Sequence, residues 1–352
     1  MPALHPGQII KLNDQSWSVR QLHQLAGSRL TLELIGITAA SQGMMRRLTA
    51  VQIGPHLFID RQRKGYWQTN LETDWSNDGS GPALFCRPAT TLDLIDAHTQ
   101  YAPTGDLPNR FSWSYSRSAL YRHCPRAYYY HYYGSWNGWD RGSPAPVRRL
   151  YLLKNLISIE QWIDTLVHDT IKSALVRLVN DRPVIPADLI TKMRQRARSD
   201  FEDSHSGRFR DQPGKFTGFQ EHYYQSPVPP SAWTRAWERA EQALLTFLTS
   251  PLFAHFARQP PDSFLDLRTL QSFELAGHTV WAQSDLIYRK RETIIIFDWK
   301  TGEPDTTEEE WQMGVHGLFT RRHWPEWAAL QLKGVTVYLV EYSTKAVSYT
   351  HL

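Results

Sequence analysis

The stretch IIIFDWKTGEP, Ile294 to Pro304, constrains the fold more than any other part of this 352-residue sequence. Three isoleucines and a phenylalanine form an apolar run that is typical of a buried strand. Because side chains alternate along a strand, Asp298 and Lys300 point to the same side, with Cα atoms roughly 6.6–6.8 Å apart. The sequence therefore predicts a core strand whose end presents an acid and an amine together.

The preceding segment, TVWAQSDLIYR, supplies a second acid, Asp285. If the two strands form an antiparallel meander and Asp285 lies on the same face, it sits across from Asp298. Neighbouring carboxylates repel each other unless a cation lies between them, and carboxylate oxygens suit Mg²⁺ or Mn²⁺. Such a metal polarises a phosphoryl oxygen and activates water, which Lys300 could orient. The alternative for an acid-x-lysine pattern at a strand end is a surface ion pair.

A third candidate ligand lies in the helical pattern SIEQWIDTLVHDTIKSALVRLVN. Ser158 and Gln161 predict a capping box at its start. His168 falls at the edge of the apolar stripe, where a side chain can face a cleft, and neutral imidazole is a good metal ligand. For His168 alone, a core or helix-surface role would be favoured. Together with the two acids, it predicts a metal centre.

The chain divides into two kinds of sequence. Residues 1–105 contain short alternating runs separated by turn residues, which predict a small β-barrel or β-sandwich domain. A polar, proline-containing segment starting at Ala97 predicts a linker. Residues 106–352 predict an α/β domain, a mixed sheet flanked by helices, with a helical wall over 111–258 and a catalytic sheet over 264–345.

Composition excludes several classes of protein. No apolar run approaches the ~20 residues of a membrane helix, and no secretion signal opens the chain, so we expect a cytoplasmic protein without a membrane partner. The two cysteines are too few for a disulfide scaffold or an iron–sulfur cluster. The sequence contains no Walker motif, so we do not expect an ATP-driven motor. The net charge of +4 permits a polyanionic partner. The terminal AVSYTHL is expected to be translated adapter sequence.

Aromatic residues are abundant, with 14 Trp and 16 Tyr, and some are expected to face a ligand, since bases stack on aromatic rings. Five tyrosines between Tyr128 and Tyr133 would circle a helix, which predicts base stacking or a partner surface. Arg117, Arg122 and Arg126 recur on the same predicted helix. They predict either a row of phosphate contacts or a solvated face.

Four motifs, in this order, resemble the RecB-like and Cas4-like branch of the PD-(D/E)XK nuclease superfamily: SWSYSRSALYRHCPRAYYYHYYG, LVHDTIKSAL, SDLIY and IIIFDWKTG. The resemblance covers about Ser112 to Tyr342. It implies a restriction-endonuclease-like fold with a catalytic lysine at Lys300. It also implies a divalent metal held by the side chains of His168, Asp285 and Asp298 and by the backbone carbonyl of Trp299.

The resemblance also reaches three residues outside this set. Gln312 matches a glutamine that lies on a helix facing DNA, and the tyrosine expected four residues later is His316. Cys124 occupies the place of a cluster cysteine, but its three partners are absent, so no iron–sulfur cluster is expected. Gln312 and His316 are therefore predicted to contact nucleic acid, and His316 and Cys124 depart from the residues typical of this branch.

We therefore predict a metal-dependent nuclease that hydrolyses DNA phosphodiester bonds. The abundance of aromatic residues and the resemblance to this nuclease branch favour an exonuclease acting on single-stranded DNA or DNA ends in repair, recombination or defence. One alternative is a catalytically inactive, nuclease-like module that binds DNA or a protein. Another is an adaptor whose N-terminal domain binds a helicase or a defence-system partner.

Overall fold

The structure, a computed structural model, describes residues 4–25, 29–61, 64–77, 82–101, 109–302 and 306–348. By internal contacts the chain forms two compact units. The N-terminal unit comprises Met1–Asn109 and Cys124–Asn155, and the C-terminal unit comprises Arg110–His123 and Leu156–Leu352. Both units are therefore built from segments that are discontinuous in sequence.

The N-terminal unit contains one sheet with the strand order β1-β2-β3-β4-β5-β6-β8-β7. Its first strand pairs antiparallel with β2 and parallel with β8, which closes the sheet into a barrel-like form. Its core includes the fully buried Trp17, Leu32 and Leu34. The predicted N-terminal all-β fold is confirmed. The strands are β1 (Ile9–Leu12), β2 (Gln15–Gln24), β3 (Arg29–Gly36), β4 (Met45–Ile53), β5 (His56–Asp60), β6 (Tyr66–Asn70), β7 (Trp75–Asn77) and β8 (Pro82–Ala89).

Helices complete this unit. The first, α1 (Thr91–Tyr101), buries Leu94 and Ile95, so the linker predicted from Ala97 is wrong in its first five residues. Residues 102–108 of that linker lie outside the described residues. The others are α3 (Pro125–Tyr129), the π-helical turn η1 (Tyr130–Gly134) and α4 (Ala145–Lys154).

The C-terminal unit contains a five-stranded mixed sheet with the order β12-β15-β16-β17-β18. The pair β16–β17 is parallel and the others are antiparallel. A parallel pair needs a crossover, and α10 (Thr306–His323) supplies it. The mixed α/β architecture predicted for this part of the chain is confirmed. The strands are β12 (Phe264–Asp266), β15 (Leu286–Lys290), β16 (Thr293–Lys300), β17 (Gln331–Tyr338) and β18 (Ser343–Ser348).

The antiparallel meander predicted for TVWAQSDLIYR and the strand that contains Asp298 is wrong in one respect. The segment TVWAQSDLIYR is two strands, β14 (His278–Ala282) and β15, and they belong to different sheets. The first pairs with β13 (Gln271–Leu275) and β9 (Ser112–Ser114). The backbone N–H of Trp299 donates to the carboxylate of Asp285 at 2.9 Å rather than to a strand carbonyl, so the β15–β16 ladder stops there.

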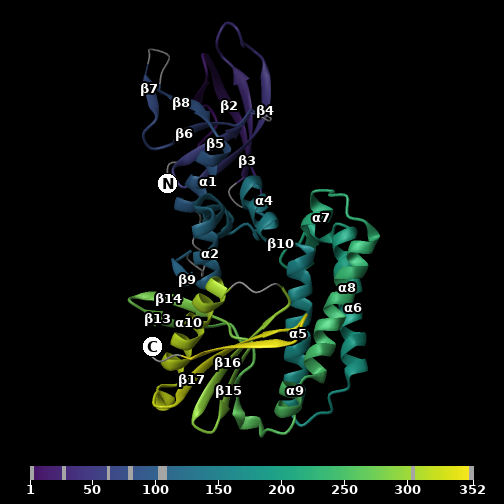
Figure 1. Cartoon of the computed structure of the whole chain (residues 1–352). Coiled ribbons are helices and arrows are strands. Elements are labelled where there is room, and N and C mark those ends of the chain that lie inside the picture. The colour runs from purple at the N-terminus through teal and green to yellow at the C-terminus, as the bar shows by residue number, and fades with distance from the viewer. Residues whose placement is uncertain are drawn as a thin grey trace. The chain divides into compact units, whose positions relative to one another are not determined.

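Helices cover both faces of the five-stranded sheet (Figure 1). On one face α5 (Ile159–Val179), α8 (Pro230–Thr249) and α6 (Pro186–His205) share a core with Phe297 and Trp299 of β16. On the other face α10 packs on Ile294 and Ile296. The alternating faces predicted for β16 are therefore the two packed faces of the sheet.

Short elements connect these helices. Between α6 and α8 the chain forms one turn of 3₁₀-helix, a two-residue strand and a short helix: η2 (Arg208–Arg210), β11 (Gly218–Phe219) and α7 (Gln220–Tyr223). The strand β11 pairs in parallel with β10 (Leu156–Ile157), directly before α5. Three further short elements are α2 (Tyr115–His123), α9 (Pro251–Phe256) and the 3₁₀ turn η3 (Pro261–Ser263).

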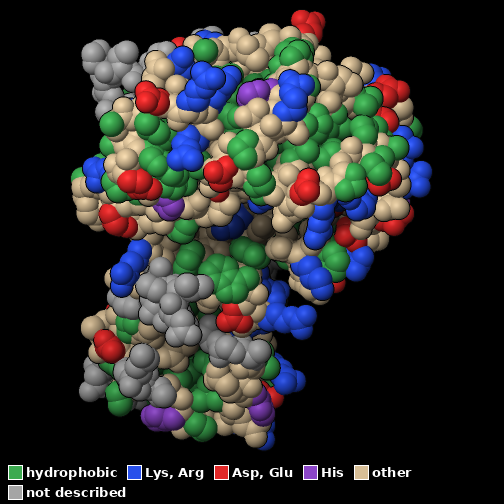
Figure 2. Space-filling model, turned by 90° about the horizontal axis from the view of Figure 1, so that it is seen from below, with side chains coloured by type: hydrophobic (Ala, Val, Ile, Leu, Met, Phe, Trp, Pro, Cys, Tyr) green, Lys and Arg blue, Asp and Glu red, His purple; other side chains and the backbone are tan. Residues whose placement is uncertain are grey.

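The surface carries no broad field of one sign on the face that Figure 2 shows, where basic and acidic side chains are interspersed with apolar ones. This pattern agrees with 39 Lys and Arg against 35 Asp and Glu in the sequence. Among the described residues, no helix has the length and apolar character needed to cross a membrane.

Candidate active site

Four predicted side chains meet at the carboxyl end of β16, where β15 begins. Continuing the register Leu286↔Phe297 by one residue puts Asp285 opposite Asp298. Both carboxylates are buried, with exposed fractions of 7% and 5%. His168 reaches this point from α5, and Lys300 extends from the last residue of β16. The two acids and the two basic groups thus lie around one end of the sheet.

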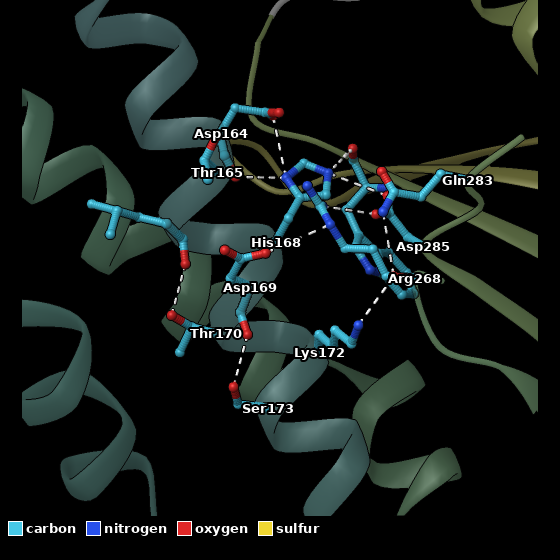
Figure 3. Close-up of polar contacts among 12 residues, drawn as sticks. Asp164, Thr165, His168, Asp169, Thr170, Lys172, Ser173, Arg268, Gln283 and Asp285 are labelled. Carbon is cyan, nitrogen blue, oxygen red and sulfur yellow. Dashed lines mark hydrogen bonds and ion pairs between the residues drawn. The ribbon is translucent and has the colours of Figure 1, made fainter. Parts of the chain in front are cut away.

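His168 lies between two backbone carbonyls. Its Nδ1 bonds to the carbonyl oxygen of Asp164 at 2.7 Å, one helical turn earlier (Figure 3). Its Nε2 lies 2.9 Å from the carbonyl oxygen of Trp299 and 3.2 Å from Oδ2 of Asp285. The bond at Nδ1 fixes the ring, so Nε2 is the nitrogen presented to the acid and to the strand end.

Asp298, Lys300 and Gln312 form a closed triangle of polar contacts. Lys300 Nζ lies 2.7 Å from Oδ2 of Asp298 and donates to Oε1 of Gln312 at 2.9 Å. The Nε2 of Gln312 donates to Oδ1 of Asp298 at 3.1 Å. Gln312 lies on α10, the helix that follows β16. This helix therefore supplies the side chain that contacts both Asp298 and Lys300.

Burial and charge shift the ionisation of the two acids in opposite directions. Burial, followed by the charge of Asp285, raises the pKa of Asp298 to about 6 against the opposing effect of Lys300. Burial would also raise the pKa of Asp285, but His168 and Arg268 outweigh it, so that pKa is lowered. When no other cation is present, the basic side chains alone therefore offset the negative charge of the two carboxylates.

The acidic neighbours raise the pKa values of the two basic groups. Burial would lower the pKa of His168, yet the neighbouring Asp285 carboxylate raises it to about 9. Burial would likewise lower the pKa of Lys300, and Asp298 raises it. His168 is accordingly an imidazolium whose two N–H groups face carbonyl oxygens. Coordination of a metal through Nε2 would require loss of that proton.

The donor atoms fit a hard divalent cation. In an octahedral Mg²⁺ site with bonds of about 2.1 Å, adjacent ligand atoms lie about 3 Å apart. The separations of His168 Nε2 from Trp299 O and Asp285 Oδ2, 2.9 and 3.2 Å, match that spacing. Asp298 is instead turned to Lys300, and among the described residues no three His, Cys, Asp or Glu side chains already form a metal-binding group. Three of the four predicted donors therefore converge, with the fourth beside them.

Several residues predicted to contact nucleic acid lie elsewhere. His316 is buried, 3% exposed, and burial lowers its pKa to about 4, so this conformation does not favour direct contact with DNA. The helix expected for the three arginines, with a kink or split at Pro125, is two helices, because Pro125 begins a new one. Arg117 and Arg122 lie on α2 of the C-terminal unit, whereas Arg126 lies on α3 of the N-terminal unit.

The tyrosine cluster also belongs to the N-terminal unit. The ring of Tyr128 lies 5.1 Å from that of Tyr132 and 5.9 Å from that of Tyr133, between ring centroids. Arg126 lies over the ring of Tyr130. Contacts of Tyr128 and of the three arginines with nucleic acid stay predictions. Cys124, the position of the absent cluster cysteine, caps α3 by accepting the N–H of Ala127.

Sequence reasoning missed Arg268, which donates to Oδ1 of Asp285 at 3.0 Å. It lies in the loop between β12 and β13, where no periodic pattern points to a site. Asp164 was also missed. Its carbonyl holds His168, and its carboxylate accepts from the hydroxyl of Thr301 at 3.1 Å.

An apolar cavity of about 860 Å³ opens on another side of α10. Its aromatic lining includes Trp311, which is 61% exposed and directly precedes Gln312, together with Phe111, Trp113 and Phe273. One exposed aromatic ring, that of Trp311, thus lies on the same helix as a residue of the site.

A protein-family model described as the PD-(D/E)XK nuclease superfamily matches residues 112–347. The chain belongs to this superfamily. No curated protein matches. A solved structure titled "Crystal structure of SSO0001" is similar at 13% identity and a TM-score of 0.19, over 37% of this chain and 61% of that chain. That likeness is too slight to support the fold or the RecB-like and Cas4-like branch.

Proposed function

We propose that this protein is a divalent-metal-dependent deoxyribonuclease that hydrolyses phosphodiester bonds at the end of β16. The observation that carries the proposal is the convergence of His168 Nε2, Asp285 Oδ2 and the Trp299 carbonyl at metal-ligand spacing, in a member of a nuclease superfamily. A structural role alone does not explain why two buried acids, an imidazole and an ammonium gather at one strand end.

His168, Asp285, Asp298 and the Trp299 carbonyl would hold Mg²⁺ or Mn²⁺. When bound, the metal supplies Lewis-acid polarisation of a phosphoryl oxygen. Asp164 keeps the His168 ring oriented, and the N–H of Trp299 holds the Asp285 carboxylate. The fixed orientation of both groups lowers the reorganisation needed when substrate arrives.

Lys300 is the group that we assign to the attacking water. An ammonium has three N–H donors, and Lys300 directs two of them at Asp298 and Gln312. Among the described residues the third donor has no protein partner, and we assign it to a water or a phosphoryl oxygen. Because the pKa of Lys300 is raised, it acts as a cation that orients and stabilises charge rather than as a base.

Single-stranded DNA or DNA ends are the substrate that we favour, with exonuclease action in repair, recombination or defence. Unstacked bases can stack on exposed aromatic rings, and Trp311 offers such a ring beside Gln312. The interspersed surface charges favour local phosphate contacts over a broad basic face. A helicase or other protein partner at the barrel-like sheet is a further part of the proposal.

The test is a cleavage assay on labelled single-stranded DNA, duplex DNA and RNA with Mg²⁺, Mn²⁺ or EDTA. We expect metal-dependent cutting that falls about 100- to 1,000-fold in Lys300→Ala and Asp298→Ala, because the first removes the cation assigned to the attacking water and the second removes a proposed metal ligand. Lys290→Ala, an exposed lysine at the far end of β15, is the matched control and should cut normally.

Cutting that persists in EDTA, or that both active-site variants retain, contradicts the mechanism. Intact DNA under every metal condition, together with retained DNA binding, would instead identify an inactive nuclease-like module.

A further inference from the structure

Arg268 connects the sheet and helix sides of the site. Its NH1 donates to Oδ1 of Asp285 at 3.0 Å, and its Nε lies 3.7 Å from Oδ1 of Asp169 (Figure 3). Asp169 directly follows His168 in α5. The guanidinium therefore spans from the acid at the start of β15 to the helix that carries the imidazole.

The backbone of Arg268 is held in an unfavourable conformation. Its φ of 48° lies in the left-handed region, which a non-glycine residue adopts at a cost unless its surroundings hold it there. Two side chains donate to its carbonyl oxygen, Lys172 Nζ at 3.1 Å and Gln283 Nε2 at 3.4 Å. Lys172 comes from α5 and Gln283 from the residues just before Asp285, so both sides of the site hold this loop.

The two oxygens of Asp285 have separate partners. Oδ1 accepts from Arg268, whereas Oδ2 accepts from the N–H of Trp299 and faces His168 Nε2. A carboxylate held at Oδ1 cannot turn about its Cβ–Cγ bond without breaking a charge-assisted hydrogen bond. Arg268 thereby fixes the plane of the Asp285 carboxylate, and with it the direction in which Oδ2 faces the donor set.

A guanidinium close to a cation site would also repel the cation. Here Asp169 offsets that charge, because it lies beside Nε of Arg268 while its other oxygen pairs with Arg196 at 2.7 Å. The charges alternate from Asp285 through Arg268 and Asp169 to Arg196. The charge of Arg268 still lowers the pKa of Asp285, and the bond to Oδ1 gives that attraction a fixed direction.

We propose that Arg268 is a positioning residue that orients Asp285 so that Oδ2 coordinates the divalent metal. The inference rests on the proposed function, since it assigns Asp285 as a ligand. Hydrogen-bond partners of metal ligands typically contribute about 10- to 100-fold to metal affinity. Arg268 acts through Asp285 and does not itself need to contact the substrate.

The test measures Mn²⁺ binding without nucleic acid, from the electron paramagnetic resonance signal of the free ion. For Arg268→Ala we expect a dissociation constant about 10- to 100-fold higher than that of the unaltered protein. DNA cleavage by this variant should recover toward the unaltered rate at saturating Mn²⁺, a response that general loss of structure does not produce. Arg194→Ala, which removes an arginine paired with Glu241 away from the site, is the matched control.

Arg268→Lys keeps the charge and loses the planar guanidinium, so this variant should bind Mn²⁺ with intermediate affinity. If the alanine variant does not fold, the lysine variant provides the test. An unchanged dissociation constant in whichever variant folds overturns the proposal. If Asp285→Asn loses Mn²⁺ binding in that same experiment, the proposed metal site stands without Arg268. Absence of Mn²⁺ binding by the unaltered protein would overturn both.

Discussion

Among single residues, we expect the substitution of buried ionisable side chains to disturb the site most. Asp298 is held by Lys300 and Gln312, and each of the three touches the other two. In such a closed set, removal of one member leaves a buried partner unsatisfied, which costs more than the lost bond alone. The site is therefore sensitive to substitutions that do not alter a proposed ligand.

Gln312→Ala tests this sensitivity. The substitution removes a donor to Asp298 and an acceptor for Lys300, so we expect the cleavage rate at saturating DNA to fall about 10- to 100-fold. Gln242→Ala, on α8, is the control. If the variant cuts at the normal rate and loses only DNA affinity, Gln312 faces DNA as the resemblance implies.

A second prediction for single residues concerns the reactivity of the two cysteines. Burial, with a smaller contribution from Asp74, raises the pKa of the Cys86 thiol to about 12, and the side chain is 2% exposed. At pH 8 its thiolate fraction is about 10⁻⁴, and the thiolate is the reactive form. Ellman's reagent should therefore titrate one thiol, the partly exposed Cys124, in the native protein and two after denaturation.

Cys124→Ser should abolish the fast native reaction in that titration. Two thiols that react at equal rates in the folded protein would show that Cys86 is not buried as described.

At the scale of elements, α5 and β16 position the site from opposite directions. The helix is anchored at its first turn, where Ser158 and Gln161 form a reciprocal capping box, and along its buried stripe. The strand is anchored by isoleucines on one face and by Phe297 and Trp299 on the other. The buried residues of both elements directly adjoin the groups that they hold, whereas the capping box holds the start of α5, ten residues before His168.

Ser158→Ala removes one half of the capping box. Loss of such a cap typically costs about 1 kcal/mol, which corresponds to a decrease in Tm of about 2–4 °C in a domain of this size. Ser173→Ala, an exposed serine within the same helix, provides the control and should not lower Tm, because alanine favours helix. Thermal denaturation followed by circular dichroism measures both, and equal Tm changes would contradict the capping role.

At the scale of the whole molecule, the chain passes from one compact unit to the other three times. Residues 124–155 belong to the N-terminal unit although they follow the first segment of the C-terminal unit. Within the N-terminal unit they contact α1: Tyr129 donates to Asp96 at 2.5 Å, and His98 bonds to the Trp136 carbonyl at 3.3 Å. The two units therefore do not correspond to two halves of the sequence.

A fragment of residues 110–352 should consequently be less stable than the full chain. Without α1, residues 124–155 lose the surface on which they pack, and exposed apolar side chains favour aggregation. We expect a lower Tm and increased binding of the dye ANS. A second fragment, 1–155, retains all of the N-terminal unit and should bind less ANS than 110–352, although its residues 110–123 lose their pairing with β14. Equal solubility and Tm of 110–352 and the full chain would show that 124–155 folds without α1.

Local sequence determined the elements and the types of residue at the site. The apolar run before Asp298, the stripe around His168 and the cap at Ser158 each depend on neighbours within a few residues, which is why their patterns are readable. The alternation that pointed Asp298 and Lys300 to one side also needs no tertiary information.

Only the tertiary structure decided how these groups are partnered. His168 meets the Trp299 carbonyl across 131 positions of sequence, and Arg268 reaches Asp285 from a loop with no periodic signal. The same holds for Gln312, for the burial of His316 and for the break between β14 and β15, where a carboxylate replaces a strand carbonyl. Periodicity specifies which way a side chain faces, but its partners are chosen by the packing of distant segments.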